Sequence, residues 1–154
     1  MRFVPSTIFG IAVATLMLSS GVASAQAFRC EVIHDKTRFV ADTIGTRSTG
    51  FRDVAGTPVT VTQASNNCLI VVFSAQVNAE SAIEFRLTKD GVPTGLPGLI
   101  NVATVDRSDY RTIRFLVPPG ADNIGTHTYT LQFRSEDGRG VSVSRFLTTV
   151  YYPD

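Results

Sequence analysis

Alternating apolar and polar residues fill most of the chain beyond residue 25, and no stretch there repeats its apolar positions at helical spacing. These runs are rich in Val, Ile, Thr, Phe and Tyr, and clusters of Gly, Pro, Asn and Asp separate them, which is typical of strands joined by turns. The strands predicted in this way are residues 29–33, 37–41, 58–63, 68–77, 83–88, 99–105, 111–117, 127–134 and 141–152. Residues 42–56 are polar and glycine-rich, and we expect a long loop there with one short edge strand.

Two of these runs predict where the core lies. The run "CLIVVF", residues 68–73, is apolar at consecutive positions, as expected for a strand covered on both faces. In the next run Ile83, Phe85 and Leu87 alternate with polar residues, which predicts one buried face and one wet face. The following Asp90-Gly91 pair predicts a tight hairpin turn.

The stretch "HTYTLQFRSEDGRGVSVSRF", residues 127–146, predicts a hairpin with its turn at residues 136–140. Its first strand directs Tyr129, Leu131 and Phe133 inward. Its second strand begins in one phase and continues in the other from Phe146 onward. This change of phase predicts a β-bulge near Ser144 or Arg145.

About eight antiparallel strands spaced roughly ten residues apart indicate a two-sheet β-sandwich of jelly-roll-like type. An immunoglobulin-like sandwich is the alternative. We favour the jelly roll because an antibody-type domain carries a buried tryptophan, and this chain has no tryptophan.

The segment "HTYTLQFRSEDGRGVSVSRFLTTVYY" resembles the C-terminal hairpin of small jelly-roll modules from bacteria and phage tails. The shared features are a Gly-x-His-Thr strand, a Gln-x-Arg-Ser end, a glycine turn and an arginine-bearing final strand. The resemblance covers about a third of the chain beyond residue 25. It implies a β-sandwich architecture and does not imply an activity.

The chain begins with the layout of a secretory signal peptide: Arg2, an apolar stretch over residues 8–18, and small residues ending in Ala23-Ser24-Ala25. We therefore expect a signal peptide at residues 1–25 and one β-sandwich domain at residues 26–154, with a second possible cut after Ala27. This apolar stretch is shorter than the roughly 20 residues that span a bilayer as a helix. The expected location is secreted or periplasmic, without a lipid anchor.

Charge and cysteine content narrow the class further. The 14 basic and 13 acidic residues balance once Arg2 is removed, which argues against a nucleic-acid-binding protein. The two cysteines, Cys30 and Cys68, predict one structural disulfide in an oxidising compartment. A redox pair or a zinc site is disfavoured because there is no Cys-x-x-Cys spacing.

No motif in the chain predicts catalysis. A Gly-x-Ser-x-Gly elbow is absent from the sequence, and the two histidines, His34 and His127, have structural explanations at strand ends. Glu84, Asp106 and Asp109 are the candidates for a carboxylate pair of the kind used in glycoside hydrolysis. The loop residues Asp106, Asp109, Asp122 and Asn123 carry oxygen atoms of the kind that bind calcium, so a calcium site is an alternative. We nevertheless predict no cofactor and no metal.

The remaining candidate is a polar surface on the outward faces of the predicted strands. Its residues, expected on neighbouring strands, are Arg86, Arg114, Gln132 and Arg134. Such a ladder suits a sugar or an acidic polymer, and it also suits cross-strand charge pairing without a ligand. We predict a secreted, non-enzymatic binding module for a glycan or an envelope protein. The alternatives are a structural subunit of a surface appendage or trimeric assembly and, less favoured, an envelope hydrolase.

Overall fold

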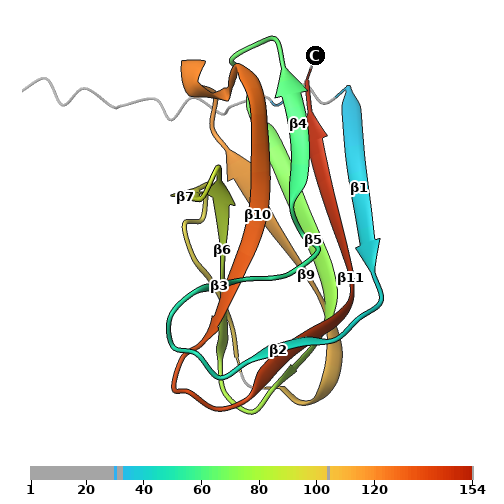
Figure 1. Cartoon of the computed structure of the whole chain (residues 1–154), viewed down its shortest axis with the longest axis vertical. Coiled ribbons are helices and arrows are strands. Elements are labelled where there is room, and N and C mark those ends of the chain that lie inside the picture. The colour runs from blue at the N-terminus through green and yellow to red at the C-terminus, as the bar shows by residue number, and fades with distance from the viewer. Residues whose placement is uncertain (1–29, 31–32, 104, 154) are drawn as a thin grey trace, which may run out of the picture.

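The computed structural model describes residues 30, 33–103 and 105–153, with the backbone alone for residues 105–107. They form two antiparallel sheets (Figure 1). Sheet A has five strands: β1 (His34–Val40), β2 (Ile44–Thr46), β5 (Leu69–Ala79), β9 (Val105–Val117) and β11 (Val141–Tyr152). Sheet B has six: β3 (Arg52–Asp53), β4 (Val59–Gln63), β6 (Ile83–Lys89), β7 (Val92–Thr94), β8 (Ile100–Val102) and β10 (Gly125–Ser135). A short 3-10 turn, η1 (Ala121–Asn123), precedes β10.

The order of the strands confirms the predicted jelly roll. Sheet A runs β1-β11-β5-β9, with β2 also on β11, and sheet B runs β3-β10-β6-β7, with β4 on β10 and β8 on β6. The successive long strands β4, β5, β6, β9, β10 and β11 therefore alternate between the two sheets. Alternation of this kind is the double Greek key of jelly rolls.

The inner faces of the two sheets share one hydrophobic core. Phe73 of β5 lies at its centre, with ring centroids 5.8 Å from Phe85 in sheet B and 5.6 Å from Phe146 in sheet A. The expected central strand is confirmed, because β5 lies between β11 and β9 and is buried at Leu69, Ile70 and Val71.

The prediction of a hairpin over residues 127–146 is wrong. β10 pairs with β3, β4 and β6 in sheet B, whereas β11 pairs with β1, β2 and β5 in sheet A. Residues 136–140 therefore form an arch that crosses between the sheets, with Gly138 at a positive φ of 84°. An alternating pattern shows that a strand has a buried face, but it does not show which strand lies beside it.

Two local predictions near these strands are confirmed. Asp90 and Gly91, both with positive φ, form a two-residue turn between β6 and β7. In β11 the pairing with β5 shifts between Ser144 and Leu147, and Arg145 adopts a φ of 47°, as expected for the bulge.

Two other expectations need correction, and a third lies largely outside the described residues. The predicted strand at residues 29–33 falls largely outside the described residues, and the first described strand begins at His34 instead. The loop over residues 42–56 holds two short strands, β2 and β3, and crosses from sheet A to sheet B. The face of β6 expected to be wet buries Glu84 and Thr88, because Glu84 pairs with an arginine of β10 and Thr88 bonds to the Thr130 carbonyl.

The predicted disulfide between Cys30 and Cys68 is present, with Cα atoms 5.4 Å apart. It joins Cys30, four residues before the start of β1, to Cys68, the residue directly before β5. Closing a loop with a sequence separation of 38 contributes about 4 kcal/mol in the chain-entropy model. The predicted signal peptide lies outside the described residues.

Candidate functional site

Three of the four predicted site residues lie together on the outer face of sheet B. Gln132 of β10 is opposite Arg86 of β6 in the register. The Arg86 Nε donates a hydrogen bond to Gln132 Oε1 at 2.7 Å, and Gln132 Nε2 donates one to Asp53 Oδ1 at 2.7 Å. This row of planar polar groups crosses three strands, β6, β10 and β3.

Arg134, the third residue, forms an ion pair with Glu84, whose residue surface is only 8% exposed. Its Nη1 also donates to the Thr49 carbonyl at 3.3 Å. The Phe51 ring lies over both guanidinium groups, with its centroid 4.0 Å from Arg86 Cζ and 4.6 Å from Arg134 Cζ. Charge-assisted hydrogen bonds and cation–π contacts are among the stronger polar contacts, so these residues hold the 49–53 segment against sheet B.

Arg114, the fourth residue, lies elsewhere, so its predicted place beside the other three is wrong. It belongs to β9 in sheet A, opposite Val72 of β5, and it is exposed on the outer face of that sheet. The alternating pattern correctly predicted that Arg114 points outward. It could not predict that β9 belongs to a different sheet from β6 and β10.

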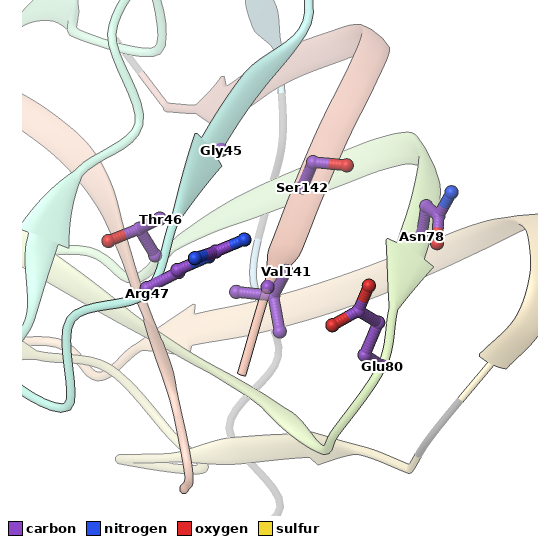
Figure 2. Close-up of a pocket in the computed structure, with 8 residues that line it drawn as sticks. Gly45, Thr46, Arg47, Asn78, Glu80, Val141 and Ser142 are labelled. Carbon is purple, nitrogen blue, oxygen red and sulfur yellow. The ribbon is translucent and has the colours of Figure 1, made fainter. Parts of the chain in front are cut away.

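A second group of polar residues surrounds an open pocket of about 460 Å³ at the end of sheet A where β2, β5 and β11 meet (Figure 2). Five polar side chains line it: Thr46 in β2, Arg47 just after β2, Asn78 in β5, Glu80 just after β5, and Ser142 in β11. The Thr46 hydroxyl accepts a hydrogen bond from Ser48 N at 3.0 Å. Figure 2 shows Arg47 and Glu80 on opposite sides of the start of β11.

The strand register explains how the pocket forms. Gly45, Ser142 and Asn78 are aligned across β2, β11 and β5. Beyond the next aligned row, Gly140 lies between Arg47 and Glu80, and Glu80 N donates to the Gly140 carbonyl at 3.1 Å. A Cβ at Gly140 would lie 3.6 Å from Glu80 Oε2 and 4.0 Å from Arg47 Nε. The missing side chain at Gly140 therefore leaves the space between the two charged groups open.

Within the described part of the chain, the side chains of Arg47, Asn78, Glu80 and Ser142 make no hydrogen bond or ion pair. In this respect the pocket differs from the group of Arg86, Gln132, Asp53, Arg134 and Glu84 on sheet B, whose polar side chains bond to one another. The sequence did not indicate this pocket, because its residues are distant in the chain and no local motif links them. The only local signal was the glycine on either side of Arg139.

The opposite end of the sandwich carries a cluster of charged turn residues. Asp90 Oδ1 accepts a hydrogen bond from Thr128 N at 2.8 Å, and its Oδ2 lies 2.7 Å from His127 Nδ1. The Thr128 amide, and then His127, hold the pKa of Asp90 below its usual range. Lys89 Nζ lies 2.5 Å from Asp122 Oδ2 and lowers the pKa of that carboxyl. His127 is thus part of a turn-stabilising network, as its position at a strand end predicted.

The carboxylates weighed for hydrolysis are separated. Glu84 pairs with Arg134 on sheet B, whereas Asp109 pairs with Arg111 at 2.9 Å on sheet A. Only the backbone of Asp106 is described, so its side chain is not placed. No three His, Cys, Asp or Glu side chains of the described residues are grouped to hold a metal ion.

His34 and Asp35 are the first two residues of β1. The His34 ring lies 5.7 Å from the Tyr152 ring, and Asp35 accepts a hydrogen bond from Thr37. Consecutive residues of a strand point to opposite faces, so the two side chains diverge.

Comparison with known proteins gives structural similarities only. No protein-family model matches the chain, and no curated protein matches it significantly. The CBM36-1 domain of a multidomain xylanase from the hindgut metagenome of Trinervitermes trinervoides is similar at 12% identity over 75% of this chain and 96% of that one, with a TM-score of 0.44. An apo-form cyclase from Fischerella sp. is similar at 9% identity over 85% and 93%, with a TM-score of 0.41.

A third similar structure is the carbohydrate-binding module CBM6cm-2 of Cellvibrio mixtus lichenase 5A, in complex with cellotriose. It has 16% identity over 80% of this chain and 100% of that one, with a TM-score of 0.34. No helix among the described residues has the length and hydrophobicity needed to cross a membrane.

Proposed function

We propose that the protein is a secreted or periplasmic, non-enzymatic binding module that holds a glycan in the pocket of Figure 2. The observation that carries this proposal is the set of four unpaired polar side chains, Arg47, Asn78, Glu80 and Ser142, around one glycine-floored hollow. The disulfide supports an oxidising compartment.

The chemistry of the pocket favours an uncharged polyhydroxylated ligand. Arg47 supplies donors, Glu80 supplies acceptors, and the amide and the hydroxyl supply both, which matches neighbouring sugar hydroxyls. The charges of Arg47 and Glu80 cancel, so the pocket does not select an anion. Its volume of about 460 Å³ lies within the range of small-molecule sites.

The test is a panel of neutral and acidic oligosaccharides, measured by isothermal titration calorimetry against the oxidised protein. We expect a neutral oligosaccharide to bind and Glu80→Gln or Arg47→Gln to weaken that binding about tenfold or more, since each change removes a charged hydrogen-bonding partner. Gly140→Ala should weaken it too, because a methyl group fills the floor.

Glu136→Gln is the matched control. Glu136 is exposed in the arch and does not line the pocket, so this substitution removes the same charge outside the pocket. The proposal is wrong if no oligosaccharide binds, or if Glu136→Gln weakens binding as much as Glu80→Gln. Binding that responds to Arg86→Ala and not to the pocket variants would place the glycan on sheet B instead.

A further inference from the structure

Strand β9 forms an open edge of sheet A. Along its 13 residues it pairs with β5 on one side only. On the other side, among the described residues, only Leu116 is bonded: its N–H and C=O bond to the Leu96 backbone at 2.9 and 2.7 Å. This contact shows which way the free backbone groups of the strand point.

Alternate residues of an antiparallel strand direct their N–H and C=O groups to the same side. Leu116 directs them away from β5, so Arg114, Thr112 and Tyr110 do as well, because their register with β5 is continuous. These three residues have no backbone hydrogen-bond partner in the described part of the chain. An unpaired row of this kind is a template for another strand.

The space beside this edge is also open. A hollow of about 300 Å³ lies between β8 of sheet B and β9 of sheet A, lined by residues 101–103 and 111–113. Strand β8 pairs with β6 and not with β9. Residues 101–103 face residues 111–113 across the hollow, so β8 does not bond to the edge of β9.

We propose that β9 pairs with β9 of a second copy of this chain, antiparallel and centred on Thr112. The backbone groups of Leu116 are already bonded to Leu96, so they cannot pair with a second copy. A two-fold pairing centred on Thr112 is therefore restricted to residues 110–114. Thr112 then lies opposite Thr112 of the second copy, and Tyr110 lies opposite Arg114 of the second copy, twice.

The side chains of this edge complement themselves under that symmetry. Tyr110 is 62% exposed, and Arg114 is exposed on the same outer face of sheet A. The two-fold pairing puts each ring beside the other copy's guanidinium, which gives two cation–π contacts. It also places Arg111 opposite Ile113 and keeps like charges apart. An isologous contact of this kind closes at a dimer, so the proposal excludes a polymer through this edge.

The first experiment uses a cysteine at the centre of the pairing. Directly opposed residues of a hydrogen-bonded antiparallel pair have Cα atoms about 5.5 Å apart, which lies within disulfide range. Thr112→Cys should therefore oxidise to a covalent dimer in air. Thr126→Cys is the control, since Thr126 is also exposed but lies opposite Thr62 of β4 in the register of sheet B. Equal cross-linking of the two variants would overturn the proposal.

The second experiment measures mass by light scattering coupled to size exclusion over a dilution series. The native protein should shift from dimer to monomer on dilution, as expected of a small interface. Tyr110→Arg places arginine opposite arginine and should weaken the dimer about tenfold or more. Adding Arg114→Tyr to Tyr110→Arg re-creates the tyrosine–arginine pair and should restore it.

Thermal midpoints of all variants verify that each one is folded. A native protein that stays monomeric at millimolar concentration overturns the proposal. So does a double variant that dimerises no better than Tyr110→Arg. Neither result bears on the glycan pocket, because residues 110–114 do not line it.

Discussion

The same residue type has different surroundings at different places in this molecule, and those surroundings decide its role. Arg86 and Arg134 lie under the Phe51 ring and bond to side chains of sheet B. Arg47 has the same charge but no partner among the described residues. The first two arginines therefore stabilise the fold, whereas the third is available to a ligand.

The Arg134–Glu84 pair should contribute measurably to stability. Arg134→Ala leaves the carboxylate of Glu84, whose side chain is 11% exposed, without its partner. We expect the free energy of unfolding to fall by about 2 kcal/mol, less than for a fully buried pair because Arg134 is partly exposed. Urea denaturation followed by circular dichroism measures the loss.

Two variants test that explanation. Adding Glu84→Gln to Arg134→Ala removes the isolated charge and should recover part of the loss. Arg114→Ala is the control and should change the free energy of unfolding by less than about 0.5 kcal/mol in dilute solution, since its side chain is exposed. Equal losses in Arg114→Ala and Arg134→Ala would contradict the assignment.

At the level of single elements, β11 shows how one residue changes the face of a strand. Val141 and Val143 are buried in the first part of the strand, and Phe146 and Val150 are buried in the second. The bulge at Arg145 adds one residue and lets both parts face the core. Without it, either the valine pair or Phe146 would point to solvent.

The conformation of Arg145 leads to a paired prediction. Its φ of 47° is costly for a side chain branched at Cβ, so Arg145→Val should lower the free energy of unfolding by about 1–2 kcal/mol. Arg145→Gly should leave it nearly unchanged, because glycine adopts this φ without strain. Denaturation curves compare the two variants. If valine is tolerated as well as glycine, the bulge is not at this residue.

The turn at Asp90 should make stability depend on pH in the acid range. Its hydrogen bonds lower the pKa of the folded carboxyl below the unfolded value of 3.8, so its stabilising effect is present above that pH. The effect disappears as the pH falls through the folded pKa. Native protein should therefore unfold at a higher temperature than Asp90→Asn at pH 6, and the difference should shrink below about pH 4.

Calorimetry between pH 7 and pH 2 measures this difference. Asp42→Asn is a suitable control, since Asp42 is exposed and its change removes the same charge outside the turn. A difference between native protein and Asp90→Asn that stays constant down to pH 2 would show that the charge of Asp90 does not matter.

At the level of the whole molecule, the sequence predicted those features that depend on one strand or one turn. The buried faces of β4, β5 and β10, the Asp90-Gly91 turn and the bulge each leave a local pattern in the chain. The disulfide was predictable because only two cysteines exist. These features were enough to indicate a jelly-roll-like sandwich.

Features that depend on which strands are neighbours were not predictable. The arch after β10 has the sequence of a hairpin turn, yet β10 and β11 belong to different sheets. Arg114 and Arg134 lie in similar alternating patterns, yet β9 and β10 also belong to different sheets. The pocket is the extreme case, because Arg47, Glu80 and Gly140 meet only through the register of β2, β5 and β11. Its chemistry appears only when the sheet is assembled.

The two proposals combine at this scale. A two-fold axis through an antiparallel strand pair is perpendicular to the sheet, so both copies present the outer face of sheet A on the same side. The pocket of Figure 2 opens at the end of sheet A, and the dimer would carry two such pockets. Two sites on one rigid body bind a repetitive polymer more tightly than either site alone.

The position of β11 has a consequence for the order of events in folding. This strand is the last one described in the sequence, yet it lies between β1 and β5 (Figure 1). Sheet A therefore cannot be completed until residues 141–152 are in place, because β11 is the strand that β1 pairs with in the described part of the chain. Pairing between such distant parts of a chain is slow. A chain in which β11 has not yet docked therefore lacks the strand that joins β1 to the rest of sheet A.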